Sequence, residues 1–239
     1  MTIGYYILLI VSALVGGIAG WWLPEAFREK VRYFLAFGAA FIMSIVFFEL
    51  LPALPYHGQR DIGLFVLLGF VSQFFLSRFS SGLEHSHVHL HLPTGRWKVL
   101  YMGLLLHAFI EGFPLHVGET EHAHMLSAST HSLLWAIIMH KIPAALVLGA
   151  LLRGSTMTLT AFAVALSIFA LSTPLGALLS QRFPHHWQLY LFAIVTGLLL
   201  QISTTILYEI DQEDHHHPDS IVTLFIFAGI ALGLLFHHF

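Results

Sequence analysis

Eight stretches of the sequence are each long and apolar enough to cross a lipid bilayer as a helix, which takes roughly 20 residues. Lipid offers no hydrogen-bond partner to a free backbone group, so we expect each stretch to be helical. The expected spans are residues 3–23, 31–53, 62–79, 97–117, 131–153, 158–181, 188–209 and 220–238. The sequence therefore predicts an all-α membrane protein with eight transmembrane helices.

Composition and connector length favour one membrane domain over residues 1–239. Charged residues make up 10% of the chain, whereas a soluble domain usually carries about a quarter. The connectors between the spans are short, and the longest, 80–96, reads SSGLEHSHVHLHLPTGR. No connector has room for a soluble domain, so we expect a single polytopic domain.

The distribution of lysine and arginine predicts the orientation in the membrane. If the N-terminus lies outside, seven basic residues fall at the cytosolic side and two at the outer side. The seven are Arg28, Lys30, Arg32, Arg78, Arg96, Lys98 and Arg153, and the two are Arg60 and Arg182. Cytosolic loops are enriched in basic residues, so the count favours both the N-terminus and the C-terminus outside. The His-rich connector 80–96 then faces the cytosol.

The cysteine and histidine content restricts the kinds of cross-link and metal site that the chain can form. Cysteine is absent, which excludes disulfides and thiolate metal sites. The net charge of −3 leaves no basic excess to attract nucleic acid, so we expect no nucleic-acid partner. The 18 histidines outnumber the 10 lysines and arginines, and neutral imidazole is the commonest metal ligand in proteins.

Four ionisable residues lie in the middle of expected spans, away from the span ends: His107 and Glu111 in the fourth, and His140 and Lys141 in the fifth. Such residues are costly in lipid and usually functional. His107 and Glu111 share one helix face, and a rise of about 1.5 Å per residue places His107 and His140 near the bilayer midplane. The two spans are consecutive and antiparallel, so these three side chains can meet in a site that suits Zn²⁺ or a similar ion. The alternative is a polar cluster that only supports packing.

Four short motifs resemble those of the ZIP family (Zrt/Irt-like proteins) of divalent-metal transporters. They read FFELLPAL in the second span, HAFIEG in the fourth, HKIPAA in the fifth and LSTPLGALL in the sixth. Together with the His-rich connector, their order and spacing are similar to the family's over nearly the whole chain. The resemblance implies eight spans, both termini outside, and a metal site between spans four and five. His107, Glu111 and His140 match the family's ligands residue by residue.

Three positions depart from the family's motifs. Ala108 replaces a usual asparagine ligand, Ala144 replaces a usual carboxylate that bridges two metal ions, and Lys141 stands where a second-site Asp or Glu is expected. The second ion of many members has therefore lost its anionic ligands here. We interpret the Lys141 ammonium group as a tethered monovalent cation in place of that ion, and we predict one intramembrane metal ion.

Other polar residues are candidates for the pathway of the ion. Glu49 ends the second span at the outer side and Glu209 ends the seventh at the inner side, and each is either a pathway residue or an interfacial charge. In the cytosolic connector four histidines alternate strictly: His85, His87, His89 and His91. An extended chain would present them on one side, and such tracts commonly bind metal weakly. They are candidates to receive the ion, and the alternative is a solvated linker.

The leading hypothesis is transport of a divalent metal ion toward the cytosol, with zinc as the first choice of substrate and Cd²⁺, Fe²⁺ or Mn²⁺ as alternatives. The expected partners are the ion and the lipid bilayer, and the resemblance is compatible with a homodimer. The compact, cysteine-free chain is typical of a bacterial inner-membrane protein.

Two other function classes stay open. A metal sensor would bind the ion without moving it, which the lost ligands would allow. An intramembrane zinc hydrolase would also need histidine and carboxylate ligands at depth. The chain has no H-E-x-x-H motif, so we do not expect an enzyme.

Overall fold

A computed structural model describes residues 3–24, 30–54, 61–79, 96–115, 123–155, 157–213 and 219–238. Over these residues the chain forms α-helices with two short π or 3₁₀ segments and no strand. Each of the eight apolar stretches corresponds to one α-helix. The helices are α1 (Ile3–Trp22), α3 (Val31–Ile45), α4 (Ile62–Phe79), α5 (Arg96–Glu111), α6 (Ala123–Gly154), α7 (Leu159–Ser180), α8 (His185–Glu213) and α9 (Ser220–His238).

Six helices in the described part of the chain are long and apolar enough to cross a membrane. They are Ile3–Trp22, Val31–Leu50, Trp97–Leu115, His131–Gly154, Leu159–Ser180 and Trp187–Asp211. Ile62–Leu76 and Ser220–Phe236 are shorter apolar helices. The all-helical fold is confirmed, while eight full crossings and the orientation of the termini stay predictions.

Prolines and glycine end two of the helices close to the predicted span ends. After Ile45 the chain widens into a π-helix, Val46–Leu50, which carries Glu49. Pro52 follows and has no N–H to continue the helical hydrogen bonds. At the end of α5, Gly112 leads into the 3₁₀ turn Phe113–Leu115.

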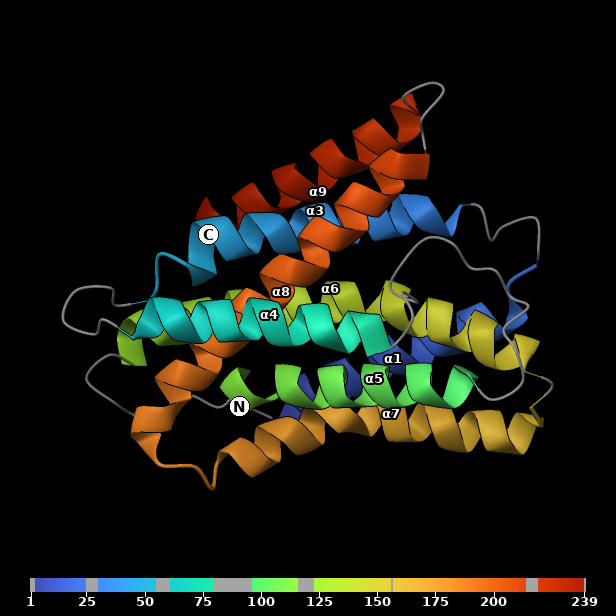
Figure 1. Cartoon of the computed structure of the whole chain (residues 1–239), viewed down its shortest axis with the longest axis horizontal. Helices are drawn as coiled ribbons and strands as arrows, with labels where there is room; N and C mark the ends of the chain where they lie inside the picture. The colour runs from blue at the N-terminus through green and yellow to red at the C-terminus, as the bar shows by residue number, and fades with distance from the viewer. Residues whose placement is uncertain are drawn as a thin grey trace.

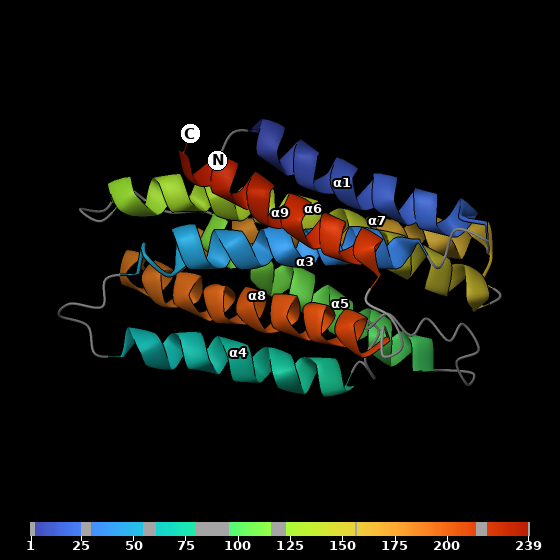
Figure 2. The ribbon, with the colours of Figure 1, turned by 90° about the horizontal axis from the view of Figure 1, so that it is seen from above.

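The helices pack as two bundles of four. The site bundle consists of α1, α5, α6 and α7, and the support bundle consists of α3, α4, α8 and α9. In Figure 1, α3 and α9 run along one side and α5 and α7 along the opposite side, while α8 crosses obliquely. Figure 2 shows that α1 begins and α9 ends at the same end of the molecule, as an even number of crossings requires. The bundles meet mainly where α3 lies on α6, where α8 lies on the 3₁₀ turn after α5, and where α4 lies beside α5.

Glycines let helices of the same bundle approach very closely. In the support bundle, a methyl group on Gly69 of α4 would overlap the carbonyl oxygen of Ile194, and one on Gly197 of α8 would overlap that of Val66. In the site bundle, Gly112 faces the carbonyl of Thr173 in the same way, and Gly176 faces that of Phe109. Small residues at such seams allow the backbones to pack directly, which is a main source of helix association in lipid.

The glycines of the other close pairs also join helices within one bundle: Gly16, Gly17, Gly20 and Gly149 in the site bundle, and Gly229 and Gly233 in the support bundle. Between the bundles, Gly38 of α3 lies opposite Pro143 of α6, where an added methyl would be 3.6 Å from the proline Cγ. That spacing is ordinary van der Waals contact. Glycine seams therefore lie within each bundle, and at the boundary the bundles share an apolar core of side chains, which includes Phe41 and Ile45 of α3 and Ile137 of α6.

Charged and polar groups join α3 to α9 at one end of the support bundle. Arg32 forms an ion pair with Asp219, and the Tyr33 hydroxyl donates to the same carboxylate over 3.1 Å. The Ile221 backbone N–H also donates to Asp219, over 2.9 Å, and so caps the start of α9. This backbone hydrogen bond, with Tyr33 and Arg32, holds the pKa of Asp219 below its ordinary value. The stabilisation that ionised Asp219 gives through these contacts is therefore fully present above the ordinary carboxylate pKa. It is lost as the pH falls through the lowered pKa.

The orientation can be tested at the two ends of α7, because the chain has no cysteine of its own. Ser155 precedes α7 and Arg182 follows it, so they lie on opposite sides of the membrane if α7 crosses it. With both termini outside, we expect Arg182→Cys to react with a membrane-impermeant maleimide on intact cells. Ser155→Cys should react only after the membrane is permeabilised. The reverse labelling pattern would show the inverted orientation.

Candidate metal site

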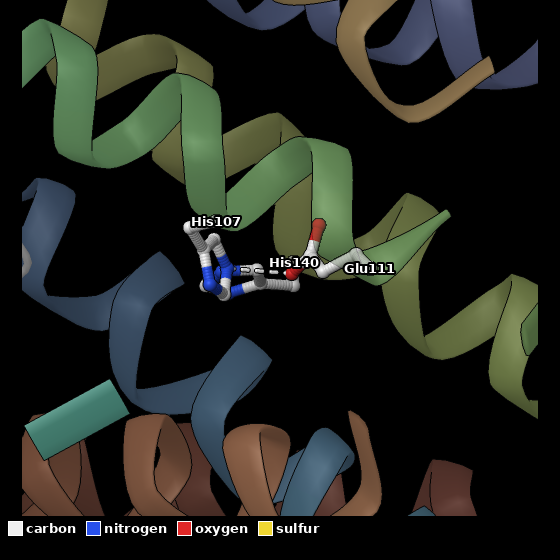
Figure 3. A group of neighbouring side chains, drawn as sticks. All are labelled: His107, Glu111 and His140. Carbon is white, nitrogen blue, oxygen red and sulfur yellow. Dashed lines mark ion pairs between the residues drawn. The ribbon is translucent and has the colours of Figure 1, made fainter. Parts of the chain in front are cut away.

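The structure brings His107, Glu111 and His140 together in the interior of the protein. One ligand atom from each side chain lies within 4.8 Å of the others. Their exposed fractions are 3%, 1% and 6%. Figure 3 shows the three side chains converging, two from α5 and one from α6. The juxtaposition expected from helix periodicity and depth is therefore present.

The two α5 residues face each other through two atoms, each of which can accept a hydrogen bond or bind a metal ion. His107 Nε2 lies 2.6 Å from Glu111 Oε1, with the two residues one helical turn apart. An imidazole lone pair and a carboxylate oxygen at this distance need a proton or a cation between them. The His140 ring lies beside them, with its centroid 5.9 Å from that of His107 and the ring planes at 85°. Two nitrogens and one oxygen so arranged can coordinate one divalent ion.

A proline lies next to the α6 ligand. α6 continues through Pro143, which is buried. Proline lacks the N–H that would bond the carbonyl one turn earlier, so the carbonyl of Met139 loses its helical donor. This carbonyl is adjacent to His140 in the chain. Free backbone oxygen at such depth is tolerated where protein or a watery cavity covers it.

Lys141 is buried beside the ligands and is held by two residues of α7. Its Nζ donates to Thr173 Oγ1 over 2.5 Å, and the Thr173 hydroxyl donates to the carbonyl of Ala108 over 2.6 Å. The ammonium group also lies 4.8 Å from the centroid of the Phe169 ring, a cation–π distance. The relay from Lys141 through Thr173 to Ala108 ties α6, α7 and α5 together. It depends on the close α5–α7 packing at Gly112 and Gly176.

The other predicted residues lie apart from this cluster or outside the described residues. Glu49 is half-buried in the π-helix after α3, and Glu209 is half-buried near the end of α8. The four connector histidines, His85, His87, His89 and His91, lie outside the described residues. A pathway role for any of these six residues stays a prediction.

Two site residues escaped the sequence analysis. Gln73 of α4 is buried, and its Oε1 lies 3.2 Å from His107 Nδ1. Thr173 of α7 is fully buried and binds Lys141. Both are uncharged, so the presence of ionisable residues in the spans does not indicate them. The sequence features that could have indicated these two residues are a glutamine inside the apolar span 62–79 and a threonine directly before a mid-span proline.

Comparison with known families gives one match. Residues 94–237 match the family model described as ZIP zinc transporter. The matched region covers more than half of the chain and includes the three candidate ligands together with Lys141 and Thr173. A search of curated proteins finds no match to the chain.

The Lys141–Thr173 contact predicts a matched pair of stability effects. Thr173→Val keeps the shape but removes the hydroxyl, which leaves a buried ammonium group short of an acceptor. We expect a loss of about 1–3 kcal/mol of stability, the usual cost of an unsatisfied buried polar group. Thr173→Ser keeps the hydroxyl and should lie close to wild type. Thermal unfolding in detergent, followed by tryptophan fluorescence, compares the two, and equal losses would assign the effect to packing.

Proposed function

The chain belongs to the ZIP family of divalent-metal transporters, and from this premise we propose that it carries zinc toward the cytosol through His107, Glu111 and His140. The main support for this proposal is that these three buried side chains converge on one point from two helices. The family consists of transporters and not enzymes, so the hydrolase alternative is set aside. A sensor would bind the metal ion without flux, and an uptake experiment distinguishes it from a transporter.

The donor set favours zinc among divalent ions. Imidazole and carboxylate ligands suit Zn²⁺, which binds nitrogen and oxygen at about 2.0–2.2 Å in tetrahedral sites. Ligands around such an ion are about 3.4 Å apart, so the observed group, within 4.8 Å, needs only small side-chain shifts to close on it. With three protein ligands, the fourth coordination position is open to water. Such incomplete coordination by the protein suits an ion that must also be released. Cd²⁺, Fe²⁺ and Mn²⁺ are the competing substrates, since imidazole and carboxylate bind them too.

Lys141 supports a single ion in the site. Its ammonium group is anchored by Thr173 and Phe169 and is close enough to Glu111 for their charges to attract. It therefore supplies one positive charge beside the carboxylate. Ala108 and Ala144, which replace ligands of the family's second ion, carry no donor atom in their side chains.

The two bundles support alternating access, in which one group of helices moves against another. All three ligands belong to the site bundle, so they can move together without being separated. The very close glycine contacts join helices of the same bundle, whereas the boundary is filled by the apolar side chains of a shared core. We therefore expect the helices within a bundle to keep their mutual packing while the side chains at this boundary repack. The ion would be exposed first to one side of the membrane and then to the other.

The single-ion proposal predicts the zinc stoichiometry. The four connector histidines are first replaced by alanine, so that weak binding there does not obscure the count. In this background we expect one tightly bound zinc ion per chain by isothermal titration calorimetry. The double variant Lys141→Asp, Ala144→Glu restores two carboxylates and should bind two. Two ions in the unmodified site would contradict the role given to Lys141.

The transport proposal predicts zinc and cadmium uptake into proteoliposomes. Wild type should accumulate metal, and His107→Ala should fall to the level of empty liposomes because a ligand is lost. His131→Ala is the matched control, since it removes an exposed histidine of α6, nine residues before His140, and should retain uptake. Uptake by His107→Ala at the wild-type rate would contradict the site. Stoichiometric binding by wild type without uptake would favour the sensor.

A further inference from the structure

A buried glutamine from the support bundle contacts the metal site. Gln73 lies on α4, is 1% exposed, and points its Oε1 at His107 Nδ1 over 3.2 Å. α4 packs mainly on α8 of its own bundle, through Gly69 and Gly197. The contact with His107 therefore crosses the boundary between the two bundles.

The direction of this hydrogen bond determines which histidine nitrogen is free for metal. An amide oxygen can only accept, so His107 Nδ1 must carry the hydrogen and donate. The other nitrogen, Nε2, is the one that lies 2.6 Å from Glu111 Oε1 in the ligand cluster. Metal-binding histidines generally donate their second ring N–H to such a partner, which orients the ring and raises its basicity. Gln73 is such a hydrogen-bond acceptor for the second ring N–H of His107.

We propose that Gln73 is a positioning residue that holds His107 ready for metal from the opposite bundle. This inference rests on the proposed function of the site. While α4 lies beside α5, the Gln73 carbonyl orients the ring so that Nε2 points toward Glu111 and His140. Movement of the site bundle against the support bundle separates Gln73 from His107. The same rearrangement that opens the site to the other side then lowers its affinity and favours release.

The test compares two substitutions of Gln73 in the protein that lacks the four connector histidines. Gln73→Leu removes the acceptor at similar volume, and Gln73→Glu retains it. Zinc affinity is measured by competition with a chromophoric chelator in detergent. We expect Gln73→Leu to weaken binding about 10- to 100-fold, as the loss of a metal ligand's hydrogen-bond partner does. Gln73→Glu should bind at least as tightly as wild type, and equal weakening by both variants would overturn the proposal.

Two controls separate positioning from packing. Gln188→Leu removes another buried glutamine, in the first turns of α8, and should leave zinc affinity unchanged. In a double-mutant cycle, Gln73→Leu should add little further loss once His107 is alanine, because its effect passes through that ring. Full additivity of the two losses would overturn the proposal.

The binding assay also distinguishes this inference from the function it builds on. If wild type binds no zinc, the proposed function of the site fails. If wild type binds zinc and Gln73→Leu binds it equally well, only the role of Gln73 fails. Neither result depends on transport activity.

Discussion

Two opposite charges, Glu111 and Lys141, are buried at the centre of the site bundle, and the surrounding structure compensates them. An isolated charge in a low-dielectric interior is very costly unless it is paired and hydrogen-bonded. Glu111 lies close enough to Lys141 for their charges to attract, and Lys141 also has the Thr173 hydroxyl and the face of Phe169. The Thr173 hydroxyl in turn donates to the Ala108 carbonyl, which requires α7 to lie directly on α5, as the glycines at that seam allow. The close packing of α5 and α7 is therefore also what allows the buried charges to be compensated.

The same packing divides the protein into parts that hold together and parts that can separate. Within each bundle, glycines let backbones touch, and such seams are hard to shift without leaving voids. Across the boundary, apolar side chains of both bundles pack in one core, and a hydrogen bond joins Gln73 to His107. A hydrogen bond between helices is easier to exchange than a backbone seam. A site whose ligands all lie in one bundle, with a supporting contact from the other, is suited to change its affinity as the bundles move.

Much of the fold could be predicted because lipid imposes strong local constraints. Apolar length predicted all eight helices, and α1, α4, α7 and α9 begin and end within one or two residues of the expected spans. Hydropathy could not predict that α6 starts at Ala123, before its apolar stretch, or that α3 widens into a π-helix at Val46. These features depend on neighbouring helices and on proline geometry as well as on the balance of apolar residues.

For the candidate site, the sequence by itself determined which ionisable groups must be buried and that His107 and Glu111 share a face. Helix periodicity and the cost of charge in lipid are local properties, readable along one segment. Only the tertiary structure decided the partners of these groups: Gln73 for His107 and Thr173 for Lys141. Each partner lies on a different helix, and its position depends on how that helix is rotated and how closely it packs. Uncharged polar residues in a span have many ways to be satisfied, so their identity alone does not reveal which contact they make.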